Sequence, residues 1–352
     1  MKKQTRFKDV AKAANVSPAT VSRVAKGLAS VDPGIRARVE KTANQLGVDL
    51  EKKRGEKPNI IGFMLANRDL VHNFQARILF GSEAYCASRE KELLFMSHRY
   101  PASVPSKELH LPKVLKQGIV QAMILGGTNS RNMLTALKER GIPFAVLGNN
   151  VLGDTNGEEY DAVYSDDVQG AYDLTTQLAG EGHRHIWFVG DISLPWYERC
   201  SQGYRRAMTQ AGLEPKMSEI HSDDRQLGYL ATRSILSRRE PMTAIFAGSD
   251  QIARGVYEAV RQAGLRIPED VSVAGFNDSE AALMDPPLTS VQEFPEELGK
   301  HLAEFVLRRL DTPTLPPQRL TIPTRVVGRR STRGNEPGRR EGVRAMPSSS
   351  KN

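Results

Sequence analysis

The sequence FKDVAKAANVSPATVSRVAKGLASVDPGIRARVEKTANQL, residues 7–46, decides the fold of the N-terminal part of the chain. In its first part apolar residues recur at the spacing of one helical face, at Phe7, Val10, Ala11 and Ala14. Asn15 follows, a residue that tolerates the positive φ of a helix end. Ser17-Pro18 and Asp32-Pro33 each combine an N-cap side chain with a proline at the first helical position. The pattern predicts three short helices with a tight turn between the first two, a helix-turn-helix.

The second predicted helix turns an apolar stripe inward and leaves its other side chains on an outer face. Short side chains there would let the helix enter a major groove of DNA, where an arginine can bond a guanine edge twice. Ser17 and Thr20, near the helix N-terminus, are placed to bond phosphates. The remaining DNA contacts are expected from Pro18, Ala19, Ser22, Arg23 and Lys26. A small helical bundle with a solvated basic face is the alternative interpretation.

The same stretch resembles the head of the lactose-repressor/galactose-repressor (LacI/GalR) family of bacterial transcription regulators. The family pattern occurs in three pieces, Lys8-Asp9-Val10-Ala11, Ala14-Asn15-Val16-Ser17 and Thr20-Val21-Ser22-Arg23-Val24. The resemblance implies that Pro18, Ala19 and Arg23 read base edges of double-stranded DNA. Lys26 stands where the family usually has asparagine, which favours a phosphate contact over a base contact.

Length and composition indicate a folded protein with more than one domain. The chain has 352 residues, too many for one ordinary core. No apolar run reaches the roughly 18 residues that cross a bilayer, and the N-terminus lacks the apolar segment of a secretion signal. Cys86 and Cys200 lie far apart without metal-ligand spacing around them. We therefore expect a cytoplasmic protein that holds reduced thiols and no membrane segment. The family resemblance further implies a bacterial protein associated with the nucleoid.

Positive charge is concentrated at the two ends of the chain. Residues 1–58 hold fourteen Lys and Arg against six Asp and Glu, a net charge of +8. Residues 329–352 hold seven against two, a net +5, which leaves 28 against 33, or −5, for the middle. A localised basic module on an acidic body suits a head that binds the phosphates of DNA.

Residues 1–47 are predicted to form the DNA-binding head, and residues 48–59 a hinge or linker. In the family this segment orders on DNA and inserts a leucine into the minor groove. Here it is shorter than usual and lacks the usual tyrosine-x-proline-asparagine turn, so Leu50 is the candidate for that role. Arg54 is the candidate for a phosphate or minor-groove contact. A flexible charged linker is the alternative interpretation.

From Ile60 onward, apolar runs of strand length alternate with amphipathic segments of helical length. The expected strands are 60–65, 93–97, 122–127, 144–149, 186–191, 244–249 and 272–277. The expected helices are 75–90, 130–140, 167–181, 201–212, 225–239 and 251–263. The glycines expected to end helices are Gly118, Gly141, Gly182, Gly212 and Gly264. The alternation predicts parallel sheets covered on both faces, in two α/β lobes that face a cleft.

The family resemblance continues through residues 60–331, carried by motifs such as Gly182-His183-Arg184, Ser249-Asp250 and Gly275-Phe276. It implies a multidomain fold class, an all-α helix-turn-helix head followed by a two-lobed α/β periplasmic-binding-protein-like (type I) core with parallel sheets. The implied N-lobe is 60–162 plus 291–321, and the implied C-lobe is 163–290 plus 322–331. A small effector would bind between strand ends at the cleft, and homodimers would bind palindromic operators.

The same resemblance assigns a set of side chains to the effector. In the family the cleft uses an aromatic residue after the first strand, an arginine in the second lobe and polar residues at later strand ends. Carried onto this sequence, the pattern gives Phe74, Arg199, Ser249 and Asn277. Three further residues complete the predicted effector-binding set: Asn67 near Phe74, Asn149 at the end of a predicted strand, and Trp196, which can stack on a ring or belong to an interface or the core. Aromatic faces stack on sugar rings, and paired donors and acceptors suit sugar hydroxyls.

Several of these positions depart from the family pattern. Cys200 occupies the usual place of the arginine, Ser249 replaces an asparagine, and Asn277 replaces an aspartate. The departures favour a neutral sugar or polyol, while a nucleobase or no effector stays open. Capping of strand and helix ends is the alternative role for Ser249, Asn277 and Asp250.

Other functional classes find little support in the sequence. The pair His183 and His185 lacks a third ligand cluster, so no metal is expected. No phosphate loop, dinucleotide motif or nucleophile elbow occurs, so no cofactor and no catalytic residue is predicted. The functional alternative is a cytoplasmic two-lobed protein that binds or acts on sugars without operator specificity. From Gly328 the chain becomes rich in Arg, Gly, Pro and Ser, and 332–352 is expected to be a disordered basic tail.

Overall fold

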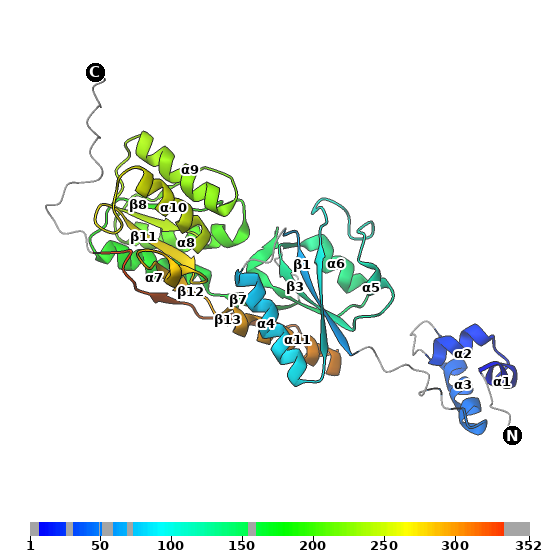
Figure 1. Ribbon diagram of the computed structural model, residues 1–352. Coiled ribbons are helices and arrows are strands. Elements are labelled where there is room, and N and C mark those ends of the chain that lie inside the picture. Colours follow the sequence, from blue (N-terminus) through cyan, green and yellow to red (C-terminus); the bar gives the residue numbers. More distant parts are fainter. Residues whose placement is uncertain are drawn as a thin grey trace, which may run out of the picture. The chain divides into compact units, whose positions relative to one another are not determined.

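The computed structural model describes residues 7–25, 31–48, 50, 59–68, 73–153 and 160–333. The chain divides into two compact units, Met1–Asn59 and Ile60–Asn352. The first is a helical head and the second a two-lobed α/β core (Figure 1). This architecture confirms the predicted fold class.

The head consists of α1 (Phe7–Ala13), α2 (Pro18–Ala25) and α3 (Pro33–Gln45). Asn15 adopts a φ of 49°, as its place between the first two helices predicted. The Ser17 hydroxyl accepts a hydrogen bond from the Thr20 N–H at 3.0 Å, and Asp32 Oδ1 accepts from the N–H groups of Gly34 and Ile35. The helices pack around fully buried side chains, Val10, Val21 and Val39. Each predicted cap is therefore made, and the apolar stripes meet in one small core.

The N-lobe is built on a six-stranded sheet in the order β13-β7-β5-β3-β1-β2, in which all pairs are parallel. Its strands are β1 (Ile60–Ala66), β2 (Glu92–His98), β3 (Ala122–Gly127), β5 (Phe144–Leu147), β7 (Asp161–Ser165) and β13 (Arg319–Ile322). Its helices are α4 (Asn73–Ser88), α5 (Lys113–Lys116), α6 (Arg131–Glu139) and α11 (Pro295–Asp311). Helices α4 and α11 lie side by side on one face (Figure 1). Short β4 (Asn129–Ser130) and β6 (Val151–Leu152) pair beside this sheet.

The C-lobe is built on a second six-stranded sheet in the order β14-β12-β11-β10-β8-β9. Its strands are β8 (Ile186–Val189), β9 (Lys216–Met217), β10 (Ala244–Ala247), β11 (Ser272–Asn277), β12 (Thr289–Gln292) and β14 (Arg325–Val327), of which only β14 runs antiparallel. Its helices are α7 (Asp167–Gly180), α8 (Pro195–Gln210), α9 (Asp224–Ser237) and α10 (Asp250–Gln262). Helix α7 packs on α8 and α9 packs on α10, and the two pairs cover opposite faces (Figure 1).

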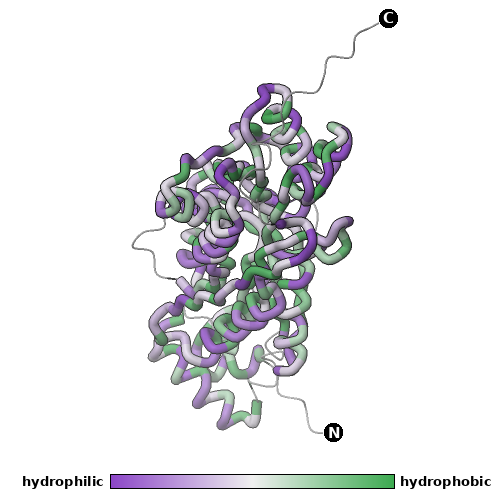
Figure 2. The backbone as a smooth tube through the Cα atoms, turned by 90° about the vertical axis from the view of Figure 1, so that its left-hand side faces the viewer, coloured by the Kyte–Doolittle hydropathy of each residue, from purple (hydrophilic) through white to green (hydrophobic). Residues whose placement is uncertain are grey.

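The chain crosses between the sheets three times, after β7, after β12 and after β13. The crossings lie at residues 165, 292 and 322, slightly later than the lobe limits that the sequence suggested, because these strands keep pairing to their last residues. Apart from β14, the strands around the crossings are parallel, so their carboxyl ends open toward the junction of the lobes. Along the helices in Figure 2, hydrophilic and hydrophobic residues alternate, as one buried and one solvated face require.

The predicted helix ends and strands are found, with local corrections. All five predicted glycines have φ between 64° and 91°. Three strands end at Leu147, Val189 and Ala247, two residues before the predicted limits, because the following polar residues turn into loops. Helix α8 begins at Pro195 instead of residue 201, since that proline can occupy the first helical turn. Strands β7, β12, β13 and β14 and helix α11 were not recognised in the sequence.

The folded core also extends further along the chain than the amino-acid composition suggested. Ser331 donates a hydrogen bond to the Val273 carbonyl at 2.6 Å and accepts one from the Thr289 N–H at 2.7 Å. The Arg333 N–H donates to the Ser272 hydroxyl at 3.2 Å. Composition assigned residues 328–333 to a disordered segment or to its start. These residues instead bind the C-lobe beside β11. The tail beyond Arg333 lies outside the described residues.

Candidate functional site

The outer face of α2 presents the side chains that the sequence predicted for DNA. Ser17, Pro18, Ala19 and Arg23 are exposed, and Thr20 and Ser22 are half-buried. On the inner face Val21 and Val24 are buried in the head core. The helix therefore offers a row of short side chains around one long cation, a shape that fits a major groove.

Three other predicted DNA contacts, Lys26, Arg54 and Leu50, stay predictions. Lys26 and Arg54 lie outside the described residues. Leu50 is partly buried and packs, with Val48, against the hydrophobic cluster of the head. Its insertion into a minor groove would require Leu50 to leave that cluster, and the role stays a prediction.

A cavity of about 90 Å³ opens at the junction of the two lobes. This volume is several times the roughly 10–15 Å³ that one water needs. Five of the predicted effector residues line it: Phe74, Asn149, Trp196, Ser249 and Asn277. Further lining residues that the sequence did not indicate are Arg68, Gln75, Asn150, Asp167, Asp224 and Glu293. Aromatic rings and polar side chains from both lobes thus face one shared cavity.

Asn67 was predicted beside the first strand but does not line the cavity. It follows β1 with a φ of 51°. Its Oδ1 accepts a hydrogen bond from the Tyr100 N–H at 2.8 Å, and its Nδ2 donates to the Thr128 carbonyl at 3.2 Å. The Asn67 side chain therefore holds two loops together instead of facing the cavity.

Arg199 was also predicted to face the effector, and it instead pairs with a buried carboxylate. Its Nε donates to Asp167 Oδ1 at 2.8 Å and to Oδ2 at 3.0 Å. Asn149 Nδ2 donates to the same carboxylate at 2.6 Å. Burial raises the pKa of Asp167, and the adjacent guanidinium of Arg199 opposes that rise. Cys200, which stands at the family's arginine position, lines the cavity in its place.

Ser249 combines the two roles that the sequence left open. Its hydroxyl accepts from the Ile252 N–H at 3.1 Å, which caps α10, and donates to Asp224 Oδ2 at 3.0 Å. Asp224 opens helix α9 and lines the cavity. Tyr197, between them, is fully enclosed, and burial raises the pKa of its phenol well above the usual value. Ser249 is thus a cap that also orients a cavity carboxylate.

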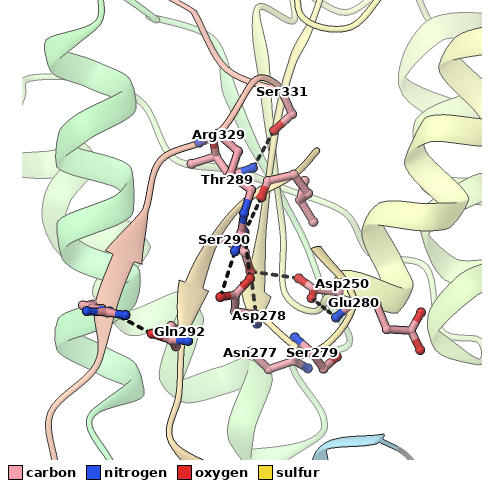
Figure 3. A network of polar contacts seen from close by, with 12 residues as sticks. Asp250, Asn277, Asp278, Ser279, Glu280, Thr289, Ser290, Gln292, Arg329 and Ser331 are labelled. Carbon is pink, nitrogen blue, oxygen red and sulfur yellow. Dashed lines mark hydrogen bonds and ion pairs between the residues drawn. The ribbon is translucent and has the colours of Figure 1, made fainter. Parts of the chain in front are cut away.

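Asn277 reaches the cavity from the end of β11, where the backbone is unusual. Asn277 and Asp278 have φ values of 80° and 48°. Figure 3 shows the polar network behind this turn, in which Asp250 accepts from the Ser290 hydroxyl at 2.8 Å and from the Glu280 N–H at 2.9 Å. Burial raises the pKa of Asp250 to about 6. Asp250 therefore fixes the turn, which is the capping role considered for it.

Glu293 lies directly after β12, where the chain crosses back to the N-lobe. Only 9% of the residue is exposed, and it lines the cavity. Burial raises its pKa to about 8, and the nearby carboxylates of Asp167 and Asp250 add to the rise. Glu293 is therefore mostly protonated at neutral pH and can donate a hydrogen bond as well as accept one. Nothing in its sequence context, VQEFPEE, signals this burial.

Within the described residues, none of the helices is long and apolar enough to cross a membrane. Two family models match the chain. One, described as bacterial regulatory proteins of the lacI family, matches residues 6–48. The other, described as a periplasmic binding protein-like domain, matches residues 175–332. The head and the C-lobe are thus recognised independently.

Whole-chain relatives agree with both models. The HTH-type transcriptional regulator DegA of Bacillus subtilis (strain 168) is 30% identical over 341 residues, which cover 94% of this chain and 98% of DegA. A complex of the transcriptional regulator CelR with cellobiose has a TM-score of 0.70 at 26% identity, and covers 93% of this chain and all of that one. The lac repressor dimer bound to operator and an anti-inducer shares the fold, with a TM-score of 0.68 at 19% identity, covering 94% of this chain and 99% of that one.

The similarity to these relatives extends over both the helical head and the two-lobed core. The chain therefore belongs to the lacI family of bacterial regulatory proteins, and it is a DNA-binding transcriptional regulator.

Proposed function

We propose that this regulator is a repressor whose affinity for its operator changes when a small effector, a sugar or a sugar derivative, binds at the junction of the lobes. The observation that carries the proposal is the cavity lined by Phe74 and Trp196 together with polar side chains from both lobes. CelR, a similar regulator, was solved with cellobiose. An aromatic and hydrogen-bonding lining is the usual environment of a bound sugar.

The DNA-binding roles follow from the exposed face of α2. Arg23 reads a guanine edge, with Pro18 and Ala19 at base edges beside it. Ser17, Thr20 and Ser22 bond phosphates or sugars of the backbone, and Lys26 adds a phosphate contact. In the segment behind the head, Leu50 and Arg54 contact the minor groove.

Effector binding acts on the head through the arrangement of the lobes. Asn73 of the N-lobe donates a hydrogen bond to the Ser279 carbonyl of the C-lobe at 3.0 Å. Arg68 of the N-lobe lies over the Trp196 ring of the C-lobe. A ligand that contacts both lobes favours one relative position over another by its difference in affinity for the two. That shift changes how well two heads fit two half-sites.

The regulator works as a homodimer on a palindromic operator. Among the described residues, the most exposed large apolar side chains are Leu283, at 81%, and Phe80, at 64%. Exposed side chains of this kind are common at interfaces between subunits. The lac repressor, which shares the fold, was solved as an operator-bound dimer. Two heads related by two-fold symmetry read two half-sites of one sequence.

The test is selection of bound duplexes from a random library by the full-length protein, followed by filter binding. A palindromic consensus with a steep fall of affinity with salt supports the proposal, since each phosphate contact releases counterions. Equal affinity for all duplexes would instead support the alternative, a two-lobed protein that binds sugars without operator specificity. In this proposal the chain acts on bacterial nucleoid DNA in the cytoplasm and performs no catalysis.

A further inference from the structure

Arg68 is the cavity residue whose charge has no counter-ion among the residues that the structure describes. It follows β1 on the N-lobe side, and its guanidinium carbon lies 4.3 Å from the centroid of the Trp196 ring. Its Nε is buried and has no hydrogen-bond partner within the described chain. Arg199, the other arginine near the cavity, is by contrast paired with Asp167.

Stacking on Trp196 holds the Arg68 guanidinium without using its donors. The attraction between a cation and an aromatic face acts perpendicular to the ring. The N–H groups of a guanidinium lie in its own plane, so a stacked arginine can still offer two parallel donors to an oxyanion. A buried donor that is left unsatisfied destabilises the folded protein, and more so when it is charged. A ligand oxygen at this place would remove that cost.

Asn150 offers a second unused polar group on the same lobe. It is 5% exposed, lines the cavity, and forms no side-chain hydrogen bond with another described residue. Its neighbour Asn149 is different, because its amide donates to Asp167 and to the Ser165 carbonyl and accepts from the Ser165 N–H. Asn149 therefore holds the junction together, and Asn150 is free to bind a ligand.

The C-lobe wall carries a carboxylate that suits hydroxyl groups. Asp224 accepts a hydrogen bond from Ser249, and it has no ion pair with any described residue. The charge of Asp167 is already balanced by Arg199. The cavity thus has a cation on the N-lobe and, on the C-lobe, a carboxylate without a counter-ion among the described residues, with the ring of Phe74 lining the space as well.

We propose that the effector is a sugar acid of about one sugar unit, whose carboxylate binds Arg68 and Asn150 and whose hydroxyls bind Asp224. The inference rests on the proposed function, and it specifies the charge of the ligand in that same cavity. It differs from the neutral sugar that the sequence favoured, because no sequence motif places Arg68 at the cavity. The volume of about 90 Å³ suits one sugar unit better than two.

The test compares matched ligands that differ by one charge. Isothermal titration calorimetry with the full-length protein would use D-galacturonate against D-galactose, D-glucuronate against D-glucose, and D-gluconate against D-sorbitol. At least one acid should bind about 10- to 100-fold more tightly than its neutral partner, which is the range of one charged hydrogen-bonding contact. The same acid should change operator affinity in a filter-binding assay. If no acid binds better than its neutral partner, including the case in which nothing binds, the inference is overturned.

Substitutions at Arg68 then test whether this residue binds the carboxylate of the ligand. Arg68→Gln should remove the preference for the acid by about 10-fold or more while binding of the neutral partner changes little. Arg68→Lys keeps the charge but loses the paired donors, so its preference for the acid should lie between those of wild type and Arg68→Gln. It also takes the place of Arg68→Gln in the test if that variant does not fold. Arg225→Gln removes the same charge from an exposed pair with Glu258, and should leave acid binding unchanged. Equal preference in wild type and Arg68→Gln overturns the assignment.

These experiments test the charge of the ligand and the proposed regulatory function separately. If a neutral sugar binds and shifts operator affinity while all acids fail, the sugar-responsive repressor stands and the charged ligand is wrong. If an acid binds through Arg68 but operator affinity does not respond, the ligand assignment stands and the regulatory proposal fails.

Discussion

Glu293→Gln should stabilise the protein at alkaline pH and flatten the dependence of its stability on pH. The folded protein raises the pKa of Glu293 from 4.5 to about 8 because the side chain is buried at the junction of the lobes. The folded state therefore holds this proton more tightly than the unfolded chain does. Its contribution to stability is complete below pH 4.5 and is lost as the pH rises through about 8. Glutamine keeps the shape and carries no charge to bury.

The size of the effect follows from the two pKa values. They differ by about 3.5, and 1.36 kcal/mol for each pKa unit gives about 5 kcal/mol for a rigid environment. Relaxation and entry of water lower the cost of a buried charge, so we expect Glu293→Gln to gain about 2–5 kcal/mol over wild type at pH 9. At pH 5 the two proteins should differ by less than about 1 kcal/mol.

The assay is urea unfolding of both proteins between pH 5 and pH 9, followed by circular dichroism. Glu258→Gln is the matched control, because Glu258 is 42% exposed in a surface pair and should change stability by no more than about 1 kcal/mol at any pH. Parallel curves for wild type and Glu293→Gln across this range would show that Glu293 is ionised at no cost, and the account of its burial would be wrong.

Three further predictions concern the head, a helix cap and the subunit interface. Arg23→Ala should cost about 1–3 kcal/mol in operator affinity and relax the preference at one base pair, whereas Lys26→Ala should weaken all sequences alike. Filter binding to single-site operator variants checks this, and identical profiles for the two variants would contradict the role of Arg23. Ser249→Ala removes the cap of α10 and should lower the free energy of unfolding by about 0.5–2 kcal/mol, measured by urea unfolding, with Ser237→Ala on the surface of α9 as the control. Leu283→Asp should shift the protein from dimer to monomer in analytical ultracentrifugation, while Leu46→Asp in the head should not; an unchanged dimer would remove Leu283 from the interface.

The head could be derived almost completely from the sequence because its signals are local. Helix caps, prolines and apolar spacing act within a few residues of one another. Ser17, Asn15 and Asp32 therefore behave in the structure as their neighbours in the chain predict. The strands of the core that are apolar on both faces were recognised for the same reason, since their composition alone marks them as buried.

The elements that were missed carry mixed sequences and gain their partners from distant parts of the chain. Strand β12, TSVQ, has a single apolar residue, so nothing in its composition marks a buried strand. Strand β13, RLTI, alternates polar with apolar residues and pairs with β7, which lies far away in sequence. Helix α11 packs on α4 across more than two hundred residues, as the Arg77 to Glu296 bond illustrates. Such contacts follow from the three crossings between the lobes, which no local pattern encodes.

The cavity residues show the same difference between local and long-range signals. Phe74, Ser249 and Asn277 follow motifs at strand ends or helix starts, so their positions could be carried over from the family pattern. Arg199 was assigned by the same pattern, and Asn67 by its place near Phe74, but both bind neighbours that the sequence does not place beside them. Arg68 and Glu293 reach the cavity from segments without a motif, so only the fold shows them.

The stacking of Arg68 on Trp196 has an optical consequence. The chain contains two tryptophans, and the other, Trp187, lies in β8 with its indole N–H bonded to the Pro241 carbonyl at 3.0 Å. Trp187→Phe would leave a single indole, which is covered by a cation from the opposite lobe. Its emission would then change whenever the lobes separate, and would give a label-free record, in real time, of the motion that links ligand to operator.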